Sequence, residues 1–299
     1  MKKLILFFGL GLAFNAYGIN DWLDCGKDAL GYTANCQYKI DTDGTLTIRG
    51  TGNSGNIGYW LYHDKDEIVQ PWKGQGVTNV IIEDSIKDLG TLGFANIASE
   101  NPIIIPSSVT QIRRYALDGV NVSEVIIPNS VTSIEEAAFA WSAIQKIDIP
   151  VSVKTIENSA FRAMTGLTDL IVPDSVEKIG SNALSYCSNL KILTIGENTQ
   201  LGKIFTGFDG DGVFTDIANL EIYCTGDTAK CDANLAAAGY PELKTSKATT
   251  KQINGVTYVY DKNGKLVTSS GHRTEKRIYT IDEANAVAGD KNRVSIKYR

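Results

Sequence analysis

The chain has 299 residues, of which 43% are hydrophobic and 21% charged, so it contains enough apolar mass to form a core. Its formal net charge is −5. Nucleic-acid-binding proteins usually carry a basic stripe, and we therefore expect no nucleic-acid partner.

The N-terminus has the three-part layout of a secretory signal peptide. Two lysines follow the initiating methionine, Leu4 to Phe14 form an apolar run, and Ala16 and Gly18 place small residues before a cut after Gly18. An anchor that is never cut is the alternative. The run is too short for a mature membrane helix, and no later segment approaches about 18 consecutive apolar residues. We expect residues 1–18 to be removed and the protein to be exported, secreted or at the cell surface, without a membrane span.

Five cysteines would then meet an oxidising compartment. Two pairs are close in sequence, Cys25 with Cys36 and Cys224 with Cys231, and we predict a disulfide in each. Cys187 is left over. A metal site is a poor alternative, because the chain has no CxxC motif and its two histidines lie far from each other and from the cysteines.

Residues 19–76 precede a series of repeats and are predicted to form a β-rich cap. Aromatic residues gather in this segment, as Tyr59, Trp60, Tyr62 and Trp72. Large aromatic side chains suit the task of covering the apolar end of a stack of repeats. Aromatic clusters also occur in sugar-binding sites, which is the second interpretation.

The repeat is spelled Pro-x-Ser-Val-x-x-Ile. It begins at Pro106, Pro128, Pro150 and Pro173, with spacings of 22, 22 and 23 residues, and an earlier unit without the proline starts near Glu83. An Ala-Phe or Ala-Leu pair follows in each unit, and alternating aliphatic residues close it. Alternation places one set of side chains inward, and proline ends the second strand.

A single unit of this size cannot fold alone. Burial of about six apolar side chains, each contributing roughly 1.5–3 kcal/mol, does not offset the ordering entropy of about 1–2 kcal/mol per residue. The units must therefore stack, which makes residues 77–196 a solenoid.

This pattern resembles the BspA-like leucine-rich repeats of bacterial surface proteins. The segment from Ser185 to Leu190, Ser-Tyr-Cys-Ser-Asn-Leu, is similar to the cysteine-containing part of that repeat, and the likeness covers residues 36–196. It implies that Cys187 is a buried repeat residue. The fold class it implies is a β-rich repeat solenoid of 22–23-residue leucine-rich repeats, with an N-terminal β cap and a small C-terminal α+β segment.

The period decays after Gly196, and residues 197–245 are predicted to be a degenerate repeat and C-terminal cap. Residues 246–299 are predicted to be a hairpin-containing tail, a candidate sorting or attachment segment, whose turn is Asn263-Gly264. The smaller elements expected here are a strand over 218–224, a helix over 233–238, a linker over 244–251, a helix over 282–288 and a strand over 294–298.

Outward positions of the closing strands form the candidate binding surface. Three isoleucines in one column are more apolar than solubility requires, and an apolar stripe rimmed by charge is typical of a contact surface. Strand propensity alone is the alternative explanation. The first column is Ile104, Ile126, Asp148, Ile171 and Thr194, and its neighbour contains Glu124, Lys146, Asp169 and Ile192.

No enzymatic motif accompanies these features. The chain has no G-x-S-x-G elbow, H-E-x-x-H motif or P-loop, so we expect no catalytic residue, metal or cofactor. The resemblance implies a protein that mediates protein–protein interaction or adhesion at the bacterial surface. The expected partner is a host or neighbouring-cell protein, such as a component of the extracellular matrix. The alternative is a carbohydrate-binding module that uses the N-terminal aromatics.

Overall fold

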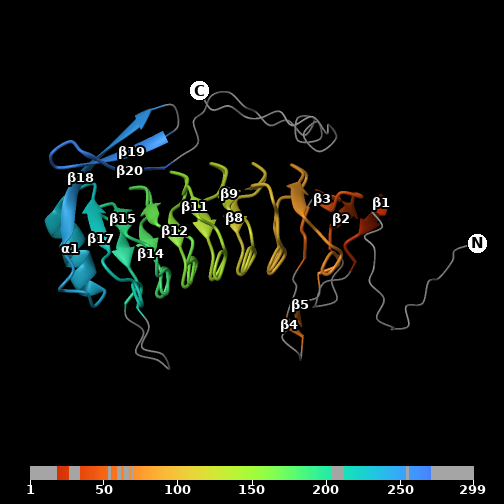
Figure 1. The fold of residues 1–299 in the computed structure, drawn as a ribbon, viewed down its shortest axis with the longest axis horizontal. Helices are drawn as coiled ribbons and strands as arrows, with labels where there is room; N and C mark the ends of the chain where they lie inside the picture. Colours follow the sequence, from red (N-terminus) through yellow and green to blue (C-terminus); the bar gives the residue numbers. More distant parts are fainter. Residues whose placement is uncertain are drawn as a thin grey trace, which may run out of the picture.

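The computed structural model describes residues 19–26, 34–52, 55–58, 62–63, 67–68, 70–203, 212–253 and 256–270. Within these residues the protein is an elongated stack of repeats with a β cap at one end and a helix at the other (Figure 1). The predicted β-rich repeat solenoid is confirmed.

The N-terminal cap is a four-stranded sheet with the order β1-β2-β3-β6. Its first three strands are antiparallel, whereas β6 joins β3 in parallel and leads into the repeats. The predicted Cys25–Cys36 disulfide is present. The strands are β1 (Ile19–Asp24), β2 (Cys36–Ile40), β3 (Thr45–Gly50) and β6 (Asn79–Ile82), and a short pair, β4 (Tyr62–His63) and β5 (Glu67–Ile68), lies between β3 and β6.

Each repeat contributes a strand to two parallel ladders, because its inward aliphatic residues recur at the same positions. The outward side of the first ladder is called the repeat face. Its strands are β7 (Ile103–Ile104), β9 (Glu124–Ile126), β11 (Lys146–Ile147), β13 (Asp169–Ile171), β15 (Ile192–Ile195) and β17 (Glu221–Cys224). This ladder is interrupted between β11 and β13, so its first three and last three strands belong to separate sheets. The second ladder consists of β8 (Gln111–Ile112), β10 (Ser133–Ile134), β12 (Thr155–Ile156), β14 (Lys178–Ile179) and β16 (Gln200–Leu201).

A third ladder runs through the Ala-Phe turns. The backbone N–H of Phe139 donates to the carbonyl of Ala160, 2.8 Å away, and Phe161 repeats the contact with Ala183 at 2.9 Å. The two phenylalanine rings stack inside with their centroids 5.8 Å apart. The turns therefore satisfy their backbone groups between repeats and align an apolar spine along the core.

The spine and its ladder are closed at the N-terminal end by two side chains of the cap. Trp72 is buried and stacks on Phe94 with the ring centroids 6.0 Å apart. Gln70 donates from Nε2 to the carbonyls of Leu92 and Ala95, which have no earlier repeat to bond to. The structure thus favours capping for Trp72. Tyr59 and Trp60 lie outside the described residues, as does the side chain of Tyr62.

The serine of the Pro-x-Ser-Val motif ties each repeat to the one before it. Ser130 Oγ donates to the carbonyl of Val109, and Ser152 Oγ to that of Val131, each at 2.6 Å. Ser175 differs, because its buried Oγ has no hydrogen-bond partner among the described residues.

This difference gives a matched pair of substitutions. Ser130→Ala is expected to lower the free energy of unfolding by about 1 kcal/mol, because it removes one inter-repeat hydrogen bond. Ser175→Ala is expected to leave stability unchanged or slightly higher, since it removes a buried hydroxyl that lacks a partner. Urea unfolding of both variants measures the difference, and equal losses would refute the role given to Ser130.

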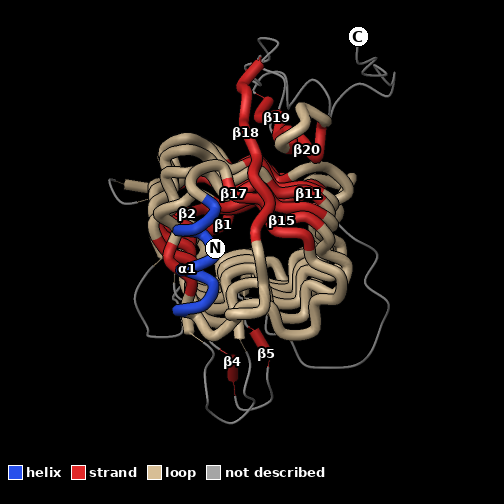
Figure 2. Tube along the Cα trace, turned by 90° about the vertical axis from the view of Figure 1, so that its left-hand side faces the viewer, coloured by secondary structure: helices blue, strands red, loops and turns tan. Residues whose placement is uncertain are grey.

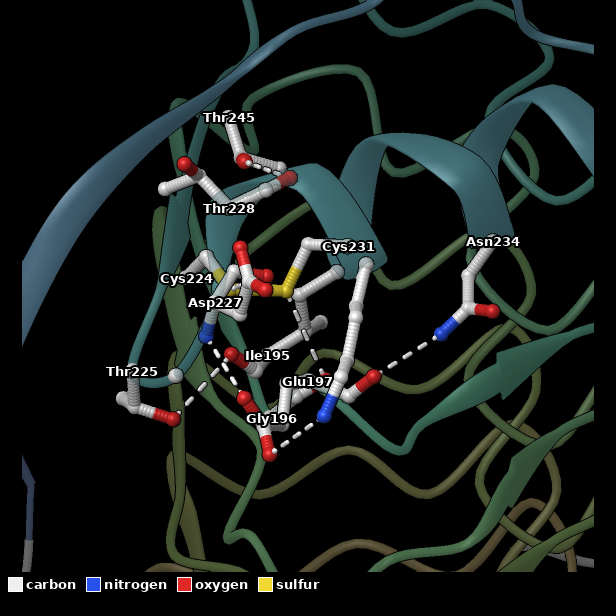
Figure 3. Close-up of a disulfide and its surroundings, with 12 residues drawn as sticks. Ile195, Gly196, Glu197, Cys224, Thr225, Asp227, Thr228, Cys231, Asn234 and Thr245 are labelled. Carbon is white, nitrogen blue, oxygen red and sulfur yellow. Dashed lines mark hydrogen bonds and ion pairs between the residues drawn. A yellow bond between two sulfur atoms is a disulfide. The ribbon is translucent and has the colours of Figure 1, made fainter.

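The C-terminal cap is the helix α1 (Thr228–Ala237), which begins five residues earlier than predicted because Asp227 accepts a hydrogen bond from the Ala229 N–H. Asn234 Nδ2 donates to the carbonyls of Glu197 and Thr199 (Figure 3). The helix therefore supplies hydrogen-bond donors to backbone carbonyls at the end of the last repeat. The predicted Cys224–Cys231 disulfide joins β17 to the helix. No helix in the described part of the chain is long and apolar enough to cross a membrane.

The linker predicted over 244–251 is wrong. This segment belongs to β18 (Thr245–Ile253), which pairs in parallel with β17 and antiparallel with β19 (Val256–Asp261), while β20 (Leu266–Ser270) completes the predicted hairpin. The open edge of β17 supplies hydrogen-bond partners that a polar sequence alone does not reveal. The predictions for residues 1–18, 282–288 and 294–298 fall outside the described residues.

Candidate binding surface

The strand register forms part of each predicted column. Ile104 pairs with Ile126 in parallel register, and Ile171 pairs with Thr194. In the neighbouring column Lys146 pairs with Glu124 and Asp169 with Ile192. Asp148 directly follows β11, and its carboxylate lies 3.8 Å from Lys146 Nζ.

The N-terminal half of the repeat face is open. The side chain of Ile104 is 40% exposed, and that of Ile126 is half-buried beside it. Ile103 and Ile105 point the other way and are buried, so the backbone beneath Ile104 is held by the core. Glu124 and Lys146 flank this pair and supply charge of both signs.

The C-terminal half of the face is covered, which corrects the predicted exposure of Ile171 and Thr194. Ile171 is 6% exposed and Thr194 is fully buried. The hairpin β19–β20 folds back over these strands (Figure 2). Ile171 packs with Ala248 and Val259 in a small separate core, to which Tyr223 and Val267 contribute.

Polar contacts fix the end of the hairpin to the face. Thr268 Oγ1 donates to Asp169 Oδ2 at 2.9 Å, and Ser270 Oγ donates to Asp148 Oδ1. A cavity of about 180 Å³ remains beside these contacts, lined by residues of β11, β13 and β20. The carboxylates of Asp148 and Asp169 therefore accept hydrogen bonds from the hairpin and are not a free rim of the repeat face.

Burial beside the hairpin also acts on Tyr223. It raises the pKa of the Tyr223 phenol, and the hydrogen bond that Tyr223 Oη donates to Glu221 Oε2, 2.8 Å away, adds to the same effect. Both influences favour the neutral phenol over the phenolate.

Cys187 is a buried repeat residue, as the family resemblance implied. Its Sγ lies 3.1 Å from the carbonyl of Phe161, and burial raises the pKa of the thiol to about 12. A thiol with that pKa stays protonated at neutral pH, whereas the thiolate is the nucleophilic form. Among the described residues no three His, Cys, Asp or Glu side chains gather as metal ligands would.

Stacked units of 22–23 residues with parallel strands in register define a leucine-rich-repeat solenoid. Residues 72–203 match the BspA type leucine-rich repeat region in six copies. The repeat region of this chain therefore belongs to the BspA type of leucine-rich repeat. No curated protein matches the chain.

Three solved structures are similar to this chain. A leucine-rich repeat protein from T. pallidum is 21% identical with a TM-score of 0.39, and the match covers 69% of this chain and 94% of that one. A leucine-rich repeat protein from Bacteroides ovatus is 22% identical with a TM-score of 0.40, and the match covers 65% of this chain and 55% of that one. The pneumococcal vaccine antigen PcpA is 18% identical with a TM-score of 0.43, and the match covers 82% of this chain and 55% of that one.

Proposed function

We propose that this protein is an exported, non-enzymatic adhesion or interaction protein that binds another protein through the open half of its repeat face. The observation that carries the proposal is Ile104, 40% exposed and in register with Ile126 on a rigid parallel sheet. Apolar side chains held in fixed positions lose little entropy on binding, and such preorganisation favours affinity. The BspA type of the repeats supports an interaction role.

The open half of the repeat face has two boundaries. The cap sheet bounds it on the side of β6, and the hairpin bounds it near Asp148 and Asp169. Glu124 and Lys146 can pair with charges of a partner at the edge of the contact. Such charges raise the association rate more than the affinity. A protein of the host or of a neighbouring cell, such as a matrix component, is the proposed partner. The signal-peptide layout of residues 1–18 supports exposure to such partners.

The test is binding of residues 19–299 to immobilised extracellular-matrix proteins. The double variant Ile104→Ser/Ile126→Ser is expected to bind at least tenfold more weakly, because apolar contacts at the centre of an interface carry most of the energy. Its urea unfolding is expected to stay close to that of the parent, since both side chains already contact water, Ile104 at 40% exposure and Ile126 half-buried. The readout is the dissociation constant from biolayer interferometry.

Val151→Ser is the control, because Val151 is 57% exposed and lies in a turn outside the strands of the repeat face. It is expected to bind like the parent. Absence of binding by the parent, or equal binding by the double variant, would rule out the repeat face as the contact surface.

A further inference from the structure

An exposed tryptophan stands out on the Ala-Phe turns, away from the residues of the repeat face. Trp141 is 64% exposed, more than any other large hydrophobic residue of the described chain. Its backbone has φ of 59°, in the left-handed region. This conformation costs a residue that has a Cβ about 1–2 kcal/mol. Neither core packing nor backbone preference therefore explains a tryptophan at this position.

The turn ladder places a second aromatic ring in the same column. Trp141 N–H donates to the Arg162 carbonyl at 2.7 Å, and Ala163 N–H donates to the Ser185 carbonyl at 2.8 Å. Ala163 and Tyr186 share the left-handed backbone of Trp141, with φ of 56° and 63°. These three residues therefore occupy equivalent positions in consecutive repeats. At roughly 4.8 Å per step, the backbones of Trp141 and Tyr186 are about 10 Å apart.

The surroundings keep the two rings separate. Gly119 precedes Trp141 in the column and Ala163 follows it, so neither neighbour extends a large side chain beside the indole. The guanidinium of Arg162 stacks on the ring of Tyr186, 4.6 Å from its centroid. The result is two aromatic residues in one column with a spacer of one repeat, and beside the second of them an arginine that carries hydrogen-bond donors.

We propose that Trp141 and Tyr186 form a platform for a β-1,4-linked glycan. Pyranose C–H groups are attracted to the electron-rich face of an aromatic ring. In a β-1,4-linked chain every second sugar presents the same face, so sugars n and n+2 meet rings that are two repeats apart. Separate rings beside a polar group suit a sugar chain, whereas a protein interface needs a contiguous apolar centre.

The experiment titrates residues 19–299 with cellohexaose and with chitohexaose by calorimetry. Saturable binding to at least one of them is expected, with at least tenfold weaker binding of the corresponding disaccharide, because a disaccharide reaches only one ring. Trp141→Ala and Tyr186→Ala are each expected to weaken hexasaccharide binding at least tenfold. Trp141→Phe is expected to retain most of the affinity, since it keeps a ring in place.

The variants allow a clear decision. Ala163 shows that alanine adopts the backbone of this position, so Trp141→Ala is expected to fold, and circular dichroism checks it. Val151→Ala, at another exposed apolar residue, is expected to bind like the parent. Failure of both hexasaccharides to bind, or unchanged binding by Trp141→Ala, overturns the proposal. So does a loss of matrix-protein binding in Trp141→Ala without any glycan binding, because the rings would then serve a protein contact.

The outcome is separable from that of the repeat face. The Ile104→Ser/Ile126→Ser variant is expected to bind the hexasaccharide with unchanged affinity, because its substitutions lie on β7 and β9 and not on the turns. A hexasaccharide affinity that falls tenfold in this variant would place the sugar on the repeat face and overturn the platform.

Discussion

Phe139→Ala is expected to lower the free energy of unfolding by about 3–5 kcal/mol, the usual cost of removing a large aromatic side chain from a core. Phe139 is fully buried and stacks on Phe161 of the next repeat. The cavity would lie in the middle of the spine, where neither cap can close it. Urea unfolding followed by circular dichroism gives the free energy directly.

Trp141→Ala is the matched control, because it removes another aromatic ring from the same turn, two residues further on. Its ring is mostly in water, so the change is expected to stay within about 0.5 kcal/mol of the parent, as for other surface substitutions. Hydrogen exchange is expected to locate the weakening caused by Phe139→Ala in the adjoining repeats, since each repeat contacts only its neighbours. Equal effects of the two substitutions would contradict the spine as the source of stability.

Val259→Asp is expected to release the hairpin from the repeat face. Val259 is fully buried against Ala248 and Ile171, and a carboxylate without a partner costs several kcal/mol there. Trypsin is expected to cut at Lys262 and Lys265 at least tenfold faster than in the parent, because cleavage needs a detached strand. The pairing of β18 with β17 is expected to survive, since its backbone pairs, from Ile222–Thr245 to Cys224–Lys247, do not involve Val259.

Leu266→Asp introduces the same charge on the same hairpin, at a side chain that is 48% exposed. It is expected to leave the cleavage rate unchanged. A parent-like rate in Val259→Asp would mean that the hairpin is held by its hydrogen bonds to Asp148 and Asp169 and not by the apolar contact.

Local sequence signals predicted much of this structure. The repeat period placed Ile104 beside Ile126 and Ile171 beside Thr194, because a motif that recurs every 22–23 residues fixes strand register. The Asn263-Gly264 turn predicted the hairpin, and Gly264 has the left-handed backbone with φ of 78°. Both disulfides followed from cysteines that are close in the chain.

Other features left no local signal. A glutamine in a loop does not show that its amide will satisfy two turn carbonyls, yet Gln70 does so. Residues 244–251 were predicted to be a linker because they are polar and rich in Ser and Thr. The strand β18 forms there because the edge of β17 is available for pairing. The helix starts at Thr228 because Asp227 caps it, and the pattern of apolar residues from which the helix was predicted does not reveal a capping residue.

The sequence by itself determined the repeated unit, its stacking and the direction in which each strand side chain points, since these depend on neighbours within one or two periods. Only the tertiary structure decided how much of the repeat face is open. Thr268 and Asp169 are 99 residues apart in the chain and yet share a hydrogen bond. A contact of that range depends on where the whole stack ends and turns back, and no periodicity encodes it.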